Sequence, residues 1–313
     1  MKKYIAILLV AAMATLGISA CRKENSNKET KVQKDSDIKV VTTIFPEYDW
    51  VRQIAGEEAD QMDITMLLDN GVDLHSYQPT AEDIMKVSDC DLFVYVGGES
   101  DAWVDDALKQ AKNKDMQVVD LLDVLGNSAK EEEEPEYDEH VWLSVKNAEV
   151  LSKAIADALE KVDPDHKDIY QENASAYSEK LKDLDAKYQE VVDGASQKTL
   201  LFGDRFPFRY LVDDYGLSYY AAFVGCSAES EASFDTISFL ANKVDELGLK
   251  DIMAIENSNQ KIAKTIIENT KEKNQKILTL DSMQSTTSDD VKNGTTYLSV
   301  MEKNLEVLKE ALQ

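Results

Sequence analysis

The chain has 313 residues, of which 60 are Asp or Glu and 34 are Lys or Arg, so its formal net charge is −26 at pH 7. A surface of this sign repels nucleic acid, and because no basic stripe compensates for it, we expect no nucleic-acid partner. The same charge favours the accumulation of cations, although many ordinary bacterial proteins are equally acidic.

The first 37 residues read as a targeting and anchoring segment. Residues 1–20 start with two lysines, continue with an apolar run too short to span a membrane, and end in small residues, which predicts a signal peptide. The sequence ISAC, ending at Cys21, resembles a bacterial lipobox. It predicts that Cys21 carries lipid and anchors the protein to the extracytoplasmic face of the cell membrane, with residues 21–37 as a flexible tether. The alternative is plain secretion with a free Cys21.

Strand and helix patterns alternate along the remainder, which is long enough for two hydrophobic cores. The β-rich runs are IKVVTTIF, DITMLL, DLFVYVGG and MQVVDLL in the first half, and KTLLFG, LSYYAAF, DIMAIEN and KILTLD in the second. Stretches with helical spacing, such as AWVDDALKQAKN and FDTISFLANKVDEL, separate them. This alternation predicts an α/β fold with mainly parallel sheets in two sets. We expect an N-terminal α/β lobe over residues 38–145 and a C-terminal α/β lobe over residues 196–313.

Residues 146–195 have helical spacing and almost no strand signal. A first helical run ends at the Asp163-Pro164 pair, and a second continues from His166 nearly to Gly194 without Gly or Pro. One long helix joining two lobes is a stiff connector, so we expect limited closure when a ligand binds.

The stretch GNSAKEEEEPEYDE, residues 126–139, is the clearest loop signal. Its four consecutive glutamates repel one another and Pro135 blocks helix continuation, which predicts a solvated, mobile loop. The alternative is a collector of cations that feeds the neighbouring His140.

Histidine is scarce in this chain, which contains only three. His75 stands in GVDLHSYQPTAED and His140 in DEHVWLSVKNA, each beside carboxylates and aromatic residues. Neutral imidazole is the commonest nitrogen donor to a borderline-soft divalent cation, and a neighbouring carboxylate fixes its tautomer. The pattern favours a transition-metal site assembled from distant segments, against the alternative of two ordinary polar histidines. We expect His166, near a helix start, to lie at the surface.

Four motifs in order resemble the metal-binding lipoproteins of ABC importers for zinc and manganese: DLHSYQPT, VYVGGESDAW, DEHVWLSVKNA and LTLDSM. The resemblance runs from about Val40 to the C-terminus. It implies two α/β lobes bridged by a single long rigid helix, with the metal in the cleft between them. It also implies His75 and His140 as ligands from the first lobe, Asp281 as a ligand from the second, and the membrane permease subunits of an importer as partners of a monomeric, non-enzymatic protein.

The sequence departs from the family pattern at the third ligand. The family usually has His or Glu ten residues before a Tyr-Gly-Leu element, and here that position is Arg205, whose guanidinium cannot ligate a cation. Asp204 is the first candidate to replace it and Cys226 the second, and a site with three protein ligands and water is the other alternative. Arg205 could instead pair with a carboxylate such as Asp204, which would make both residues structural.

Two imidazole nitrogens and one or two carboxylates suit Zn²⁺ or Mn²⁺ and lack the thiolates of a structural zinc site. The resemblance therefore implies high-affinity capture of a divalent metal, Zn²⁺ first, for an importer. The alternatives are a manganese or iron protein of the same architecture, a surface adhesin, and a lipid-anchored zinc hydrolase. The chain contains no HExxH motif and no nucleophile elbow to support the hydrolase.

Several neighbouring residues have expected supporting roles. Asp73, Asp138 and Glu139 are candidates to orient the imidazoles, and Tyr77 and Trp142 to exclude water. We expect Cys90 to be a small buried residue without a disulfide bond. Glu256 stands at the end of a predicted strand, where its carboxylate either reaches the cleft or has a structural capping role.

Overall fold

The computed structural model describes residues 38–130, 137–223 and 231–313, all within the unit Asp37–Gln313. The predicted signal peptide, Cys21, the tether, the four glutamates of the acidic loop and Cys226 lie outside the described residues. Within the described ranges, no helix has both the length and the apolar character needed to cross a membrane.

The first sheet has four parallel strands in the order β2-β1-β3-β4. Its central strands are apolar on both faces, as buried parallel strands are, and Leu92, Phe93 and Val94 are fully buried. The strands are β1 (Ile38–Thr42), β2 (Met62–Met66), β3 (Leu92–Tyr95) and β4 (Gln117–Asp120). The helices in this part are α1 (Phe45–Ala55), α2 (Ala81–Asp89), α3 (Val104–Lys109) and α4 (Leu121–Leu125).

The second sheet repeats the arrangement, with four parallel strands in the order β6-β5-β7-β8. The strands are β5 (Thr199–Phe202), β6 (Ser218–Ala221), β7 (Asp251–Ile255) and β8 (Lys276–Leu280). The helices are α7 (Arg209–Asp214), α8 (Phe234–Leu247), α9 (Lys261–Asn269), α10 (Ser288–Lys292) and α11 (Tyr297–Ala311). Two parallel sheets with helices confirm the predicted α/β class.

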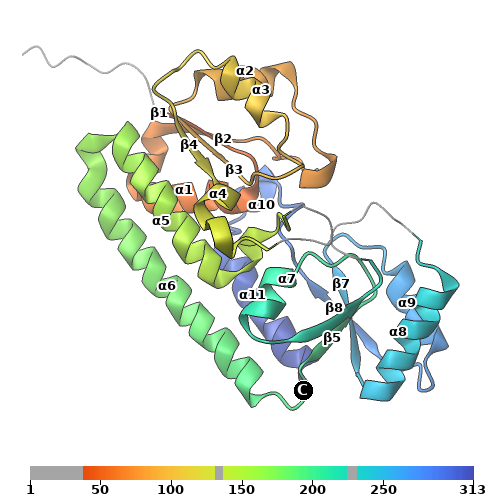
Figure 1. Ribbon diagram of the computed structural model, residues 1–313. Coiled ribbons are helices and arrows are strands. Elements are labelled where there is room, and N and C mark those ends of the chain that lie inside the picture. The colour runs from red at the N-terminus through yellow and green to blue at the C-terminus, as the bar shows by residue number, and fades with distance from the viewer. Residues whose placement is uncertain (1–37, 131–136, 224–230) are drawn as a thin grey trace, which may run out of the picture. The chain divides into compact units, whose positions relative to one another are not determined.

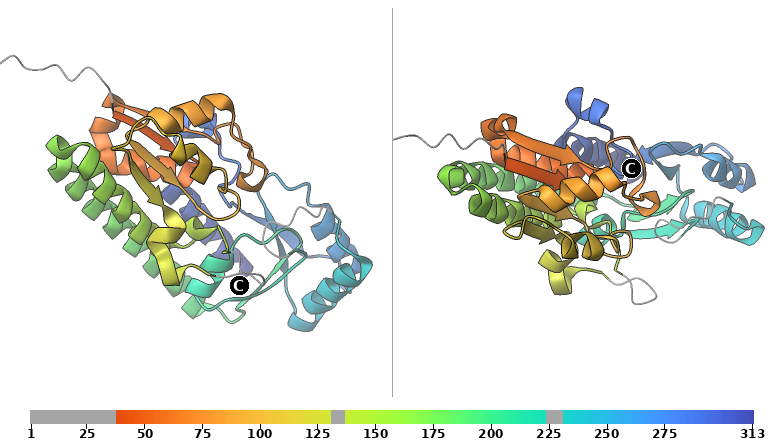
Figure 2. Two further views of the ribbon diagram at one scale, coloured as in Figure 1. Left: turned by 45° about the horizontal axis from the view of Figure 1, so that its top comes forward. Right: turned by 90° about the horizontal axis from the view of Figure 1, so that it is seen from above.

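A long helix, α6 (Lys167–Gly194), runs from the region of the first sheet to that of the second and lies beside α5 (Val145–Val162) (Figures 1 and 2). The two are joined by the short 3-10 helix η5 (Pro164–His166). The buried residues of α6 recur every three to seven positions, so one face packs inward: Tyr170, Tyr177, Leu181, Leu184, Tyr188 and Val192. Near the far end of α6, the Tyr188 hydroxyl donates to the Met301 carbonyl oxygen of α11 at 2.7 Å. The predicted long helix is confirmed.

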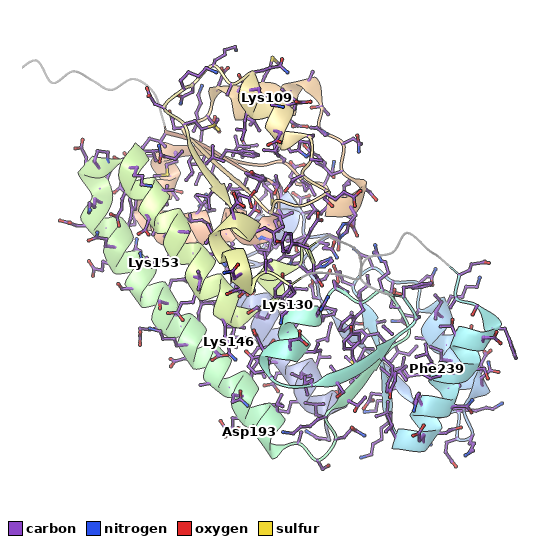
Figure 3. All side chains as sticks on the ribbon, in the orientation of Figure 1. Lys109, Lys130, Lys146, Lys153, Asp193 and Phe239 are labelled. Atoms are coloured by element: carbon purple, nitrogen blue, oxygen red, sulfur yellow. The ribbon has the colours of Figure 1, made fainter. Side chains whose placement is uncertain are left out.

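Loops from the carboxyl ends of both sheets meet, which is where parallel α/β sheets bind ligands. Asn70, after β2, forms an isolated antiparallel bridge with Thr287, after β8. Two lysines from the first half of the chain contact α7 (Figure 3). Lys130 forms an ion pair with Asp213 at 2.9 Å, and Lys146 donates a hydrogen bond to the Asp214 carbonyl oxygen at 2.9 Å. The segments that carry the predicted ligands therefore lie on connected loops.

Candidate metal centre

His75 lies on a short 3-10 helix, η2 (Leu74–Ser76), that follows β2. Asp73 caps this turn, because its Oδ1 accepts a hydrogen bond from the His75 backbone N–H at 3.0 Å. The His75 Nδ1 lies 3.0 Å from the Ser100 hydroxyl and 3.4 Å from Glu139 Oε2. The longer contact is an ion pair when His75 is protonated and is not a hydrogen bond, since Glu139 Oε2 has no hydrogen-bond partner among the described residues. Asp73 thus holds the backbone of His75, and Ser100 lies within hydrogen-bond distance of its side chain.

His140 is buried and immediately precedes the 3-10 helix η4 (Val141–Leu143). Asp138 Oδ1 accepts from the His140 backbone N–H at 2.9 Å and lies 2.8 Å from its Nδ1. Burial alone would raise the pKa of Asp138, but the charge of His140 and the hydrogen bonds from its ring and backbone lower the pKa below its usual value. Asp138, one of the three candidates from the sequence, is therefore an anion that fixes the His140 imidazole.

The two imidazoles face each other, with 3.2 Å between His75 Nε2 and His140 Nε2. Asp138 can only accept a proton, so in the neutral form of His140 the hydrogen is on Nδ1 and Nε2 presents a lone pair. At this distance the two Nε2 atoms can share either a proton, in a hydrogen bond, or a cation. Two nitrogens on one tetrahedral zinc ion, each 2.0–2.1 Å from it, would be about 3.3 Å apart. The pair thus has the spacing that one such ion requires.

The glycines of VYVGGESDAW make room for this arrangement. A Cβ at Gly98, where φ is +81°, would collide with the Glu139 carboxylate. The neighbouring Ser100 donates its backbone N–H to Glu139 Oε1 at 2.8 Å and places its hydroxyl beside His75. Sequence reasoning missed Ser100. The signal that could have found it is its place within this motif, directly after Glu99.

Asp281 immediately follows β8. Its backbone is held by Asn304 of α11, which accepts from the Asp281 N–H at 2.9 Å and donates to its carbonyl oxygen at 2.8 Å. Its Oδ1 accepts from the Met283 N–H at 2.8 Å. Burial raises the pKa of Asp281 more than the Met283 hydrogen bond and the Lys303 charge lower it. Such a carboxylate gains from a nearby cation.

One residue, Ser282, connects the His140 and Asp281 segments. Its carbonyl oxygen accepts from Trp142 Nε1 at 2.8 Å. Its N–H and hydroxyl donate to the two oxygens of Glu256, at 2.7 and 2.6 Å. Glu256, for which the sequence left two roles open, therefore holds the loop after β8. The Trp142 ring packs beside His140, with centroids 5.4 Å apart.

Asp204 and Arg205 follow β5. Arg205 pairs through Nη1 with Asp73 Oδ2 at 3.0 Å, so the suggested ion pair with Asp204 is replaced by one with Asp73, to which the loop geometry brings the guanidinium. Asp204 Oδ1 accepts only the backbone N–H of Arg205, at 2.9 Å, within the described part of the chain. Its Oδ2 is buried and has no hydrogen-bond partner there.

The structure brings His75 and His140 together, while Asp281 and Asp204 lie on neighbouring loops. Across the described ranges, no group of three or more His, Cys, Asp or Glu side chains is placed to hold a metal ion. The four-residue ligand set therefore stays a prediction. His166 is partly exposed and pairs with Asp163 at 2.7 Å, and Cys90 is buried, both as expected.

The family model described as "ZnuA: Zinc-uptake complex component A periplasmic" matches residues 40–311. The chain belongs to this family. The resemblance of the four motifs is thereby confirmed. The ZnuA family is described as a component of an uptake complex, a transport role and not an enzymatic one.

Individual relatives agree with this assignment. The "Zinc-binding lipoprotein AdcA" of Streptococcus pneumoniae is 34% identical over 315 residues, which cover 97% of this chain but 60% of that relative. The chain thus spans about three fifths of such longer relatives. The "High-affinity zinc uptake system protein ZnuA" of Bacillus subtilis is 30% identical over 323 residues, covering 99% of this chain and 98% of that protein. The Zn(II)-bound ZnuA-like domain of Streptococcus pneumoniae AdcA has a TM-score of 0.73 at 32% identity, with 88% of this chain and 99% of that one covered.

Proposed function

We propose that this ZnuA-family protein captures Zn²⁺ outside the cytoplasmic membrane and delivers it to the permease subunits of an ABC importer. The observation that carries the proposal is the 3.2 Å separation of His75 Nε2 and His140 Nε2. The names of the relatives, zinc-binding lipoprotein and zinc uptake protein, support zinc as the cargo. A nitrogen pair also suits zinc better than manganese, which prefers oxygen ligands.

In this proposal His75 and His140 bind the ion first and Asp281 completes the site, with Asp204 as a fourth donor. The support for Asp281 is the bond between Trp142 and Ser282, which joins the His140 segment to the residue next to Asp281. An ion held by both segments would link the lobe over residues 38–145 to the lobe over residues 196–313. The helices of residues 146–195 would connect them, and lipid on Cys21, after removal of residues 1–20, would anchor the assembly.

The test is zinc binding by equilibrium dialysis against a zinc buffer. The double variant His75→Ala, His140→Ala should lose tight binding of one zinc ion, whereas His166→Ala, the matched control, should retain it. Unchanged stoichiometry and affinity in the double variant would reject the site. In a parallel competition with Mn²⁺ and Fe²⁺, zinc should stay bound. If either ion displaces zinc at a comparable concentration, that ion and not zinc is the cargo.

A further inference from the structure

The C-terminal helix α11 contacts segments from both halves of the candidate centre. It packs against α1, against α6 and against β8, the strand that ends directly before Asp281 (Figure 1). The buried side chain of Asn304, in the middle of this helix, holds the Asp281 backbone with two hydrogen bonds. The first residue of the helix, Tyr297, contacts the turn that follows His140. One helix therefore joins the two segments that carry His140 and Asp281.

Tyr297 holds the turn after His140 by its backbone. The Tyr297 side chain is fully buried, and its hydroxyl donates to the Trp142 carbonyl oxygen at 2.7 Å. Trp142 lies on the turn η4, which is closed on the histidine itself because the His140 carbonyl oxygen accepts from the Leu143 N–H at 3.1 Å. The Trp142 ring also packs beside the imidazole. A shift of the Trp142 backbone would therefore move His140.

Tyr297 is itself fixed by contacts with α1. Its backbone N–H donates to Asp49 Oδ2 at 2.9 Å, and its ring meets the Trp50 ring edge-on, with centroids 5.2 Å apart. Both of these partners are buried. A hydroxyl on a ring held in this way determines where its acceptor lies, whereas a hydroxyl on a mobile ring would follow its acceptor.

Further hydrogen bonds close these contacts into a cycle. Trp142 Nε1 donates to the Ser282 carbonyl oxygen at 2.8 Å. Ser282 follows Asp281, which Asn304 holds against α11. The helix then returns to Trp142 through the Tyr297 hydroxyl. No member of this cycle can shift without straining a hydrogen bond elsewhere in it, and supporting contacts of this kind hold a binding site rigid.

We propose that Tyr297 is a positioning residue of the metal centre, which fixes the His140 turn relative to Asp281 and so determines how long the ion is retained. Tyr297 acts through Trp142 and touches no proposed ligand. The inference rests on the proposed zinc function. Capture requires only that an ion reach the donors, whereas release requires the donors to separate, so we expect the effect in the release rate.

The test compares two single-atom deletions. Tyr297→Phe removes the hydroxyl and keeps the ring. The matched control is Tyr188→Phe, since the Tyr188 hydroxyl is also buried and also donates to a backbone carbonyl oxygen at 2.7 Å, that of Met301 in the same helix. Each zinc-loaded protein is mixed with an excess of a fluorescent zinc chelator in a stopped-flow instrument, and urea denaturation measures the stability of both variants.

Tyr297→Phe should release zinc roughly 2- to 30-fold faster than the wild type, the range that mutations along a coupled network reach. Its affinity in equilibrium dialysis should fall by the same factor, because the association rate is unchanged. Tyr188→Phe should release zinc at the wild-type rate even though it also loses stability. A purely structural hydroxyl at Tyr297 would instead make the two variants alike.

A second measurement needs no variant and decides the question if Tyr297→Phe does not fold. Zinc binding to the wild-type protein should slow amide hydrogen exchange in residues 141–143 and in residues 297–300 together. Residues 308–312, at the other end of α11, should exchange as in the metal-free protein. Protection of residues 141–143 without residues 297–300 would overturn the link through Tyr297.

The outcomes distinguish this inference from the proposed function. If the wild type binds zinc and Tyr297→Phe releases it no faster than Tyr188→Phe, Tyr297 is not a positioning residue and the zinc function stands. If the wild type binds no zinc, the zinc function fails and the inference fails with it.

Discussion

Arg205 Nη1 lies 3.0 Å from Asp73 Oδ2, and this ion pair joins the loop after β5 to the turn that carries His75. Arg205, which cannot ligate a metal, is thus held by a residue two positions before the candidate ligand His75. The same aspartate uses its other oxygen to cap the His75 turn. Asp73 therefore couples the position of His75 to the charge of Arg205.

Asp73→Asn should weaken zinc binding more than it destabilises the fold. Asparagine retains the cap of the His75 turn but no longer neutralises Arg205, whose charge then opposes the cation. Both partners are partly exposed, so we expect a loss of at most about 1 kcal/mol in the free energy of unfolding. Urea denaturation and zinc dialysis measure the two effects. If Asp73→Asn binds zinc as tightly as the wild type, the ion pair has no influence on the centre.

Asp138→Asn should lower zinc affinity by about 10- to 100-fold, the usual effect of removing the carboxylate behind a ligating histidine. The amide can donate to Nδ1 as well as accept from it, so the tautomer with its lone pair on Nε2 is no longer enforced. Asp157→Asn, which breaks a surface pair with Lys153, is the matched control and should bind normally. Equal affinities for the two variants would show that Asp138 only stabilises the fold.

Trp142→Phe should leave the Ser282 carbonyl oxygen without its donor and loosen the connection between the His140 and Asp281 segments. We expect a loss of about 1–3 kcal/mol in the free energy of unfolding, the cost of an unsatisfied buried polar group, together with faster zinc release. Trp103→Phe is the control, because the Trp103 N–H is buried without a hydrogen-bond partner within the described residues. Similar unfolding and release in both variants would remove the role assigned to the Trp142 bond.

Stability should also depend on Asp49, through its contact with α11. Asp49 Oδ2 accepts from the Tyr297 N–H at 2.9 Å, and burial raises its pKa from 3.8 to about 6 despite that hydrogen bond. The folded state therefore holds the Asp49 proton more tightly than the unfolded state. Its contribution to stability is fully present below pH 3.8 and is lost as the pH rises through about 6.

The pKa change corresponds to about 3 kcal/mol. Urea denaturation across this pH range should show the wild type losing stability relative to Asp49→Asn, which cannot ionise. Asp60→Asn, at an exposed position, should follow the wild-type profile. Parallel profiles for the wild type and Asp49→Asn would mean that Asp49 does not titrate with a raised pKa.

The sequence alone was sufficient for the eight strands of the two sheets, for the long helix and for singling out the two histidines. Strand and helix periods depend on near neighbours, so the alternating runs predicted two parallel sheets and the helix α6 (Lys167–Gly194). His75 and His140 could be singled out because each stands in a motif with its own carboxylate. Asp138 lies two residues from His140 and was one of three candidates to orient an imidazole, and the structure shows that it contacts the His140 ring.

Only the tertiary structure showed which polar groups from distant parts of the sequence contact one another. Arg205 and Asp73 are 132 residues apart, Trp142 and Ser282 are 140 apart, and Ser100 reaches His75 across 25 residues. Such contacts depend on how loops at the carboxyl ends of two sheets pack against each other, and local spacing contains no information about that packing. The sequence could therefore show that Arg205 is an unsuitable ligand, but its partnership with Asp73 required the folded chain.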